Sequence, residues 1–192
     1  MRPMIPAATR PLVRALILSL GLVGAAAQAE RADRLKPLNF VADSARADDA
    51  RQVNILTGDV DITKGTMVLR AQRVEVRQNP NGTQTAVATG GKAGRAYFRQ
   101  KREGLDEFIE GESERIDYDG VSDVVHFTGR AVMRRLRGAT VADEVVGQTI
   151  TYNNTTDVFQ VVGGPASAAP GGRVRGVISP KPGAEAASGV QP

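Results

Sequence analysis

The sequence contains no cysteine, no tryptophan and a single histidine, His126. Without thiols the chain forms no disulfide, cysteine-ligated zinc site, iron–sulfur cluster or thiol nucleophile. A lone histidine excludes multi-histidine metal sites and the HExxH motif. Aromatic residues make up only 4% of the chain, fewer large apolar side chains than a compact helical enzyme usually carries. We therefore expect no enzymatic activity, no catalytic residues, no metal and no cofactor.

The sequence also lacks an apolar run long enough to cross a bilayer. The run Ala15–Ala27 has 13 residues, short of the roughly 20 that a membrane-spanning helix needs. Three arginines and no acidic residue precede this run, and small residues follow it, ending in Ala27-Gln28-Ala29. This order predicts a signal peptide over residues 1–29 that is cleaved after Ala29, so that the chain is exported to the periplasm. An uncleaved membrane anchor is the alternative.

The positive charge of the chain belongs largely to that N-terminal segment. The full sequence has 25 basic and 21 acidic residues, and removal of the three arginines in residues 1–29 leaves 22 against 21. No excess of positive charge then remains to neutralise phosphates along a nucleic acid. Nucleic acid is therefore not expected as a partner.

Short apolar runs of period two, separated by glycine, asparagine or aspartate, fill residues 38–162. No stretch beyond the signal peptide shows a sustained helical period with caps. This pattern predicts an all-β domain over residues 38–162, with no significant helix in the mature chain. We expect residues 30–37 to be a flexible leader and 163–172 a Gly/Pro/Ala linker. Residues 173–179 are predicted as a last strand, and residues 180–192 as a disordered tail.

Two parts of the β region echo each other. Ser44-Ala-Arg-Ala-Asp48 resembles Ser113-Glu-Arg-Ile-Asp117, and each is followed by a β run that ends in Thr-Gly, at Thr57-Gly58 and Thr128-Gly129. The spacing drifts between the copies, which indicates a loose duplication of hairpin units. A glycine at this place predicts a bulge or bend that lets one strand pass between two sheets.

The order of several segments resembles a known family. These segments are Leu38–Ser44, Asn54–Ile62, Ile109-Glu-Gly111 and Val124-Val-His-Phe-Thr-Gly129. Over residues 36–162 the chain resembles the LptA family of periplasmic lipopolysaccharide-transport proteins, which carry an OstA-type domain. The resemblance implies an open, twisted antiparallel β-jelly roll. The linker before the last strand and the long tail depart from the family pattern.

The resemblance also implies a function without chemistry. Lipopolysaccharide would bind with its acyl chains in the apolar interior and pass from the inner-membrane complex to the outer-membrane assembly complex. The implied partners are lipopolysaccharide, further copies of the chain stacked head to tail, an inner-membrane LptC-type component and an outer-membrane LptD-type component. The expected stacking edges are Leu38 and Phe40 at one end, and Arg173, Val174, Val177 and Ile178 at the other.

The resemblance places lipid-facing side chains at Leu38, Phe40, Phe98 and Tyr118. For Leu38 and Phe40, ordinary core packing is an equal alternative. Other apolar strand residues are expected to be plain core: Val53, Ile55, Val60, Ile62, Leu69, Val125, Phe127 and Ile150.

Charged residues give weaker candidates. Arg134, Arg135 and Arg137 are candidate contacts for lipid phosphates, although a solvated turn explains them as well. Glu110, Glu112 and Glu114 fall on one strand face in a spacing that fits no calcium-binding loop. We interpret them as solvent-facing carboxylates that discourage aggregation, and His126 as structural.

Two other functions compete with transport. An exported all-β chain can be a glycan-binding or glycan-modifying protein, but such proteins usually present aromatic platforms, and tryptophan is absent here. The nearer alternative is the membrane-anchored LptC-type component, which retains its N-terminal helix.

Overall fold

The computed structural model describes residues 33, 36–102 and 104–180, so the expected signal peptide, most of the leader and the tail beyond Pro180 lie outside the described residues. Within the described residues the chain is all-β, with short 3-10 turns at Lys92–Gly94 and Pro170–Gly172. The strands are β1 (Asn39–Val41), β2 (Ser44–Asp48), β3 (Val53–Lys64), β4 (Met67–Gln78), β5 (Gln84–Thr89), β6 (Ala96–Lys101), β7 (Glu107–Ser113), β8 (Arg115–Asp119), β9 (Val124–Arg137), β10 (Thr140–Asn153), β11 (Val158–Val162) and β12 (Arg175–Ile178).

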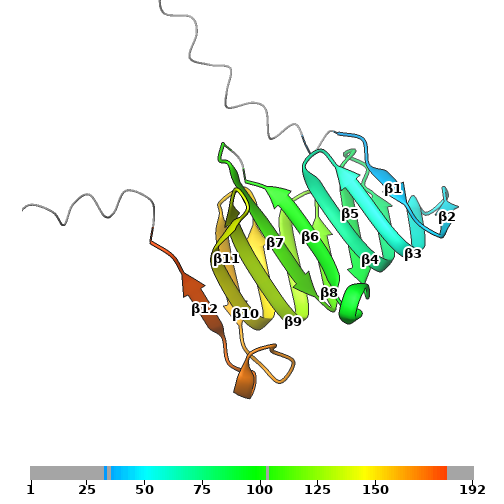
Figure 1. Ribbon diagram of the computed structural model, residues 1–192. Coiled ribbons are helices and arrows are strands. Elements are labelled where there is room, and N and C mark those ends of the chain that lie inside the picture. The colour runs from blue at the N-terminus through cyan, green and yellow to red at the C-terminus, as the bar shows by residue number, and fades with distance from the viewer. Residues whose placement is uncertain (1–32, 34–35, 103, 181–192) are drawn as a thin grey trace, which may run out of the picture.

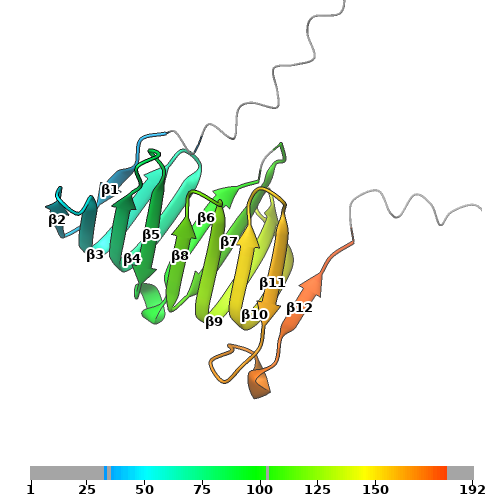
Figure 2. The same cartoon turned by 180° about the vertical axis from the view of Figure 1, so that it is seen from behind.

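The strands form one antiparallel sheet that is folded into two layers (Figures 1 and 2). Four long strands, β3, β4, β9 and β10, belong to both layers. The first layer runs β2-β3-β4-β5-β8-β9-β10-β11, and the second runs β1-β3-β4-β6-β7-β9-β10-β12. Strands β1 and β2 therefore edge one end of the molecule, and β11 and β12 edge the other. This arrangement confirms the predicted antiparallel jelly-roll class.

Each long strand changes layer at an interruption of its pairing. The β3–β4 register shifts between Thr57 and Val60, where Gly58 has φ +82° and Asp59 has φ +41°. A Cβ at Gly58 would overlap the side chain of Asp43, so both the backbone conformation and the space require glycine. Gly129 repeats this geometry in β9 with φ +80°. The bulges predicted from the two Thr-Gly pairs are confirmed.

The two halves of the chain are copies of one six-stranded unit. In the first half β3 pairs with β1, β2 and β4, and β4 pairs with β5 and β6. In the second half β9 pairs with β7, β8 and β10, and β10 pairs with β11 and β12. The halves meet where β5 pairs with β8 and β6 pairs with β7. We call this contact the internal joint.

The core lies between the two layers and is built from alternate residues of every long strand. Phe98 and Phe127 are fully buried at its centre, with ring centroids 5.9 Å apart in an edge-to-face arrangement. Burial of one such side chain contributes about 1.5–3 kcal/mol. Gly111 lies beside the Phe127 ring, and a Cβ there would overlap it. The missing side chain of Gly111 thus makes room for the aromatic pair.

We therefore expect Gly111→Ala to lower the free energy of unfolding by about 1–3 kcal/mol, because overpacking forces the Phe127 ring from its position. Denaturant titration of the purified variant measures this change. The matched control combines Gly111→Ala with Phe127→Leu, which frees space. The double variant should lose less stability than the two single losses added together. Strict additivity would contradict the overlap as the cause.

Candidate functional site

The four side chains predicted to face lipid fall in two different places. Phe98 and Tyr118 are buried in the middle of the molecule, at 0% and 6% exposure. Leu38 and Phe40 lie at the edge formed by β1, where Leu38 packs against the core and Phe40 remains 49% exposed. The structure thus connects them through the core without bringing them together.

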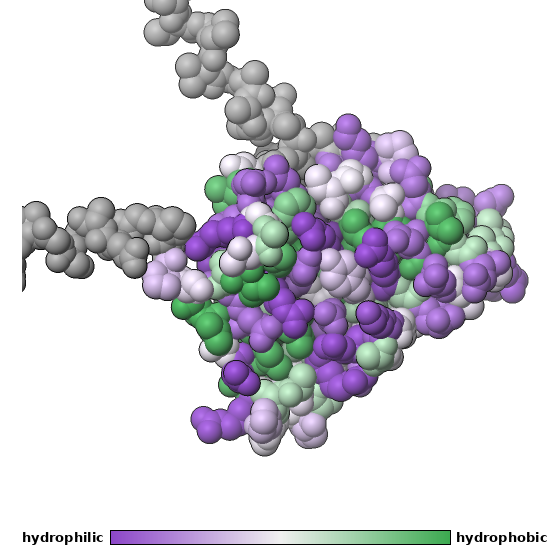
Figure 3. Space-filling model, viewed as in Figure 1, coloured by the Kyte–Doolittle hydropathy of each residue, from purple (hydrophilic) through white to green (hydrophobic). Residues whose placement is uncertain are grey.

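The apolar core extends to both ends of the molecule. At one end Phe40 lies opposite the buried Ile62, and at the other Phe159 lies opposite the buried Tyr152. Phe40 is 49% exposed and Phe159 is 41% exposed, so the core remains open to solvent at both ends. Figure 3 shows apolar surface at the end where β11 and β12 lie and again beside β1. The interior is an apolar layer that begins and ends at open strand edges.

Most of the exposed large hydrophobic side chains of the described residues belong to these edges. They are Phe40, Val41, Val158, Phe159, Val162, Val174, Val177 and Ile178. Exposed edge strands are usually protected by charge, bulges or covering segments because they pair with other chains. Apolar residues gathered on unpaired edges therefore mark both ends as contact surfaces.

The strand ends of the two layers meet along a row of polar side chains, which we call the polar seam. Its members are Lys64, Gln84, Gln100, Arg102, Asn154 and Asp157. Lys64 Nζ donates to Gln84 Oε1 at 2.8 Å, and Asn154 Nδ2 donates to Gln100 Oε1 at 3.1 Å. Arg102 Nε donates to Asp157 Oδ1 at 3.1 Å. Side chains, rather than continuous strands, hold the layers together here.

Lys64 is the most enclosed cation of the polar seam, with 5% of its surface exposed. Burial lowers the pKa of this lysine, and the carboxylates of Asp123 and Asp33 act in the opposite direction. The hydrogen bond to Gln84 satisfies one of its three donors. Lys64 thus fixes the end of β3 against the start of β5.

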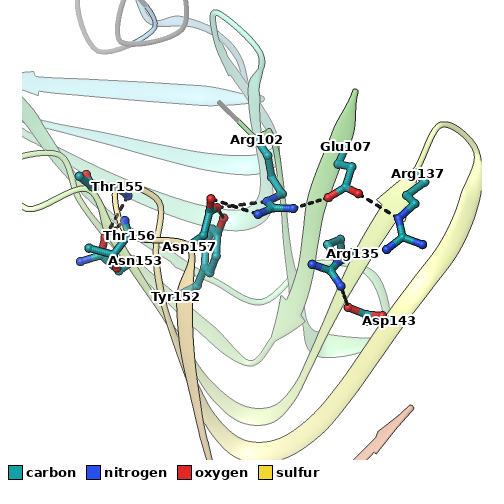
Figure 4. A network of polar contacts seen from close by, with 10 residues as sticks. All are labelled: Arg102, Glu107, Arg135, Arg137, Asp143, Tyr152, Asn153, Thr155, Thr156 and Asp157. Atoms are coloured by element: carbon teal, nitrogen blue, oxygen red, sulfur yellow. Dashed lines mark hydrogen bonds and ion pairs between the residues drawn. The ribbon is translucent and has the colours of Figure 1, made fainter. Parts of the chain in front are cut away.

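A polar network continues from the polar seam across the second layer (Figure 4). The Arg102 guanidinium contacts both Asp157 and Glu107, and Glu107 also accepts a hydrogen bond from Arg137 Nε at 2.9 Å. The Tyr152 hydroxyl donates to Asp157 Oδ1 at 2.8 Å. Burial and this hydrogen bond raise the pKa of Tyr152. The loop after β6, which holds Arg102, is joined in this way to the turn after β10, which holds Asp157.

The two carboxylates of this network are held ionised. Burial alone would raise the pKa of Glu107, but hydrogen bonds from Arg137 and Arg102 outweigh it and leave the pKa below its ordinary value. At Asp157, burial is likewise outweighed by hydrogen bonds from Arg102 and Tyr152, and the pKa is lowered. The network is therefore strongest when both groups are charged.

The three arginines predicted as phosphate contacts lie within β9, and each is paired with carboxylates. Arg134 bridges Glu112 and Glu144, with donor–acceptor distances of 3.2 and 2.8 Å. Arg135 contacts Asp143, and Arg137 contacts Glu107. A lipid phosphate would have to compete with these carboxylates for the guanidinium donors.

Two acidic side chains of β7, Glu110 and Glu112, form ion pairs on the outer face of the second layer. Glu110 accepts from Arg99 at 2.7 Å, and Glu112 lies 2.6 Å from Arg95. Sequence reasoning treated the acidic and basic runs separately, because their pairing depends on the β6–β7–β9 register. Glu114, beyond the end of β7, pairs with Arg130 next to the β9 bulge. These residues reinforce the second layer.

Among the described residues, no cluster of three or more His, Cys, Asp and Glu side chains is suited to hold a metal ion. No helix in that part of the chain has the length and apolar character needed to cross a membrane. His126 faces outward, and its Nδ1 lies 3.0 Å from Thr151 Oγ1 on the neighbouring strand. His126 thus contributes a side-chain contact between β9 and β10.

The fold and its open ends define an all-β protein built from a duplicated antiparallel jelly-roll unit. The family model described as "LptA/(LptD N-terminal domain) LPS transport protein" matches residues 39–158. The chain therefore belongs to this family of lipopolysaccharide-transport proteins. The resemblance identified from the sequence is confirmed.

Individual relatives agree with this assignment. The lipopolysaccharide export system protein LptH of Pseudomonas aeruginosa is 38% identical over 93 residues, which are 48% of this chain and 51% of LptH. The chain thus matches about half the length of that relative. The LptA protein of Escherichia coli K12 is 29% identical over 146 residues, 75% of each chain.

A solved structure shows the same fold. The crystal structure of LptH, described as the LptA-homologous periplasmic component of the lipopolysaccharide transport device of P. aeruginosa, superposes with a TM-score of 0.66. The match covers 78% of this chain and 99% of that one, at 26% identity.

The ionised carboxylates predict a dependence of stability on pH. Because the folded-state pKa values of Glu107 and Asp157 lie below their ordinary values, their contribution is complete above an unfolded-state pKa of about 4. It is lost as the pH falls through the lowered folded-state values. Glu107→Gln should lower stability at neutral pH by about 2 kcal/mol and flatten the decline below about pH 5.

Denaturant titrations at several pH values measure this effect. Asp106→Asn is the matched control, because it removes the carboxylate of the preceding residue, whose side chain is 89% exposed. An equal flattening in both variants would show that overall charge, and not the buried network, causes the acid sensitivity.

Proposed function

We propose that this protein is exported to the periplasm, where it carries lipopolysaccharide with the acyl chains in the apolar interior. It would receive the lipid from the inner-membrane complex and pass it toward the outer-membrane assembly complex, without chemical change to the lipid. The observation that carries this proposal is the apolar core that reaches both open ends. Membership of a lipopolysaccharide-transport family supports the choice of lipid.

The energetics of the cargo favour such a path. Each methylene group moved out of water contributes about 0.8 kcal/mol, so a lipid with several acyl chains crosses an aqueous compartment only if the chains stay covered. Leu38 and Phe40 are the proposed contacts at the entrance, and Phe98 and Tyr118 those in the interior. These side chains belong to one apolar layer, so an acyl chain of the lipid would stay in apolar surroundings as it advances.

Lipid can enter the interior only if the two layers separate, since Phe98 and Phe127 are fully buried in the closed form. The bends at Gly58 and Gly129 are continuous backbone and resist separation. The polar seam is joined by side-chain hydrogen bonds, each of which contributes about 0.5–1.5 kcal/mol net and can be replaced by water. We propose that the layers part along the polar seam, which leaves the sugars of the lipid in water.

Photocrosslinking in cells tests the lipid path. A photoreactive residue in place of Phe40 or Phe98 should crosslink to lipopolysaccharide, because Phe98 lies in the apolar interior and Phe40 lies at its open edge. Asn39 is the matched control, since it precedes Phe40 on the same strand and successive side chains of a strand point to opposite faces. Purified adducts are detected by immunoblot against the protein and the lipid. Equal labelling at Asn39 and Phe40 would refute an interior path.

The open edges suggest how the protein reaches its partners. At each end two edge strands have one side without a partner strand among the described residues, and a strand added there from another jelly roll would satisfy their free backbone groups by β-augmentation. The two ends differ, so the contact is heterologous and can extend head to tail. We propose that copies of this chain stack in this way between an LptC-type component at one membrane and an LptD-type component at the other.

Removal of the last strand tests this assembly. Residues 175–178 are all exposed and pair only with β10 in the described part of the chain. Deletion of residues 173–192 should therefore leave a folded domain that stays monomeric. Light scattering across a wide concentration range measures the oligomers, with circular dichroism as the control for folding. Long oligomers from the truncated chain, or a monomeric full-length chain at every concentration, would contradict the proposal.

A further inference from the structure

We propose that two copies of this chain join in the register of the internal joint, with β11 against β2 and β12 against β1 of the next copy. This inference rests on the proposed head-to-tail assembly and adds the partner strands and the residue pairs. It follows from the duplication, because the second unit ends in the same strands that the first unit uses to bind its neighbour.

The correspondence between the units is fixed residue by residue by their pairing partners. Ala71 lies opposite Val60 just past the first bulge, as Gly147 lies opposite Ala131 past the second. Counting along the paired strands from these anchors assigns each residue its counterpart. Counterparts in the edge strands are Ala86 and Phe159, Ala88 and Val161, Phe98 and Gly176, Phe40 and Gly111, Ala45 and Ile116, and Ala47 and Tyr118.

The internal joint then gives the register between copies. Its own pairs include Ala86 with Tyr118, Ala88 with Ile116, and Phe98 with Gly111. When each residue of the β5–β8 pairing is replaced by its counterpart, the register between β11 of one copy and β2 of the next is obtained. Its pairs are Val158–Asp48, Phe159–Ala47, Gln160–Arg46, Val161–Ala45 and Val162–Ser44. Strands β12 and β1 pair as Val174–Ala42, Arg175–Val41, Gly176–Phe40, Val177–Asn39 and Ile178–Leu38.

Side-chain sizes support this register. At the internal joint a small residue faces a large one in three inward pairs, with the small side chains on β5 and β7. In the joint between copies every one of these pairs is reversed: Phe159 faces Ala47, Val161 faces Ala45, and Phe40 faces Gly176. Each pair keeps one large and one small partner, which is the condition for close packing without voids or overlap.

The other inward pairs of this register are apolar as well. Val174 meets Ala42, and Ile178 meets Leu38. Val174 is 48% exposed and Ile178 is 71% exposed in the single chain, whereas Leu38 and Ala42 pack against the core. A shift by one residue would turn these side chains to the outer face. The alternation of inward and outward side chains therefore favours this register over registers shifted by one residue.

The outer face of the two joints differs. The internal joint carries the ion pair Arg99–Glu110, and its counterparts at the new joint are Val177 and Asn39, which form none. Arg95 and Glu112, 2.6 Å apart in the internal joint, correspond to Arg173 and Val41. The joint between copies thus keeps the backbone ladder and the apolar face and lacks these ion pairs, which suits an assembly that forms and separates.

Disulfide trapping tests the register, because the chain has no native cysteine. Gln160→Cys and Arg46→Cys are made in separate proteins, and the two are mixed and oxidised mildly. Both positions face outward, and directly opposite residues have the Cα separation that a disulfide needs. We expect the linked dimer to form about tenfold faster than with Val158→Cys or Val162→Cys as partner of Arg46→Cys, since those lie diagonally across the ladder.

A second pair, Val177→Cys with Asn39→Cys, reports on β12 and β1 in the same assay. Preferential trapping of both predicted pairs is the expected result. If light scattering shows head-to-tail oligomers but trapping favours the displaced partners, this register is wrong while the assembly stands. If neither oligomers nor linked dimers form at any concentration, the assembly itself is wrong and the register falls with it.

Discussion

The two bulges at Gly58 and Gly129 are the constraint on which the molecule depends. Each bulge turns one long strand from the first layer into the second, so that both layers and the space between them come from continuous backbone. Alternate residues on either side of a bulge then point into the same core, which joins buried Leu56 to Ile62 and buried Phe127 to Met133. Long strands without this turn would run straight and form one flat sheet, which would enclose no apolar interior.

Duplication of this unit explains why the ends are open. A unit completes itself only when strands of the next unit pair with its last two strands, as β8 and β7 do for β5 and β6. The second unit has no successor within the described chain, so β11 and β12 expose apolar residues that their counterparts bury. Phe159 is 41% exposed, whereas its counterpart Ala86 is 6% exposed. The same reasoning applies in reverse to β1 and β2, which lack a preceding unit.

Much of this architecture is visible in the sequence. Alternating residues such as Val60 and Ile62 predict strands, and the Thr-Gly pairs predict the bulges, because period and glycine are local signals. The cross-strand partners of Arg134 were beyond such reasoning, since Glu112 and Glu144 become its neighbours only once the register of three strands is set. The sequence also does not predict how deeply each apolar side chain is buried. Phe40 and Phe98 look alike in the sequence, but Phe40 lies on an edge and Phe98 lies in the centre.

The closed interior is compatible with transport because closure and opening depend on different interactions. Backbone ladders and the bulges hold each layer together, and they persist when the layers move apart. The polar seam depends on side chains such as Gln100 and Asn154, whose hydrogen bonds exchange readily with water. An acyl chain that replaces the packing of Phe98 with its own apolar contacts would offset much of the cost of parting the layers. In the proposed mechanism, a closed resting form would protect the apolar layer from water until a lipid arrives.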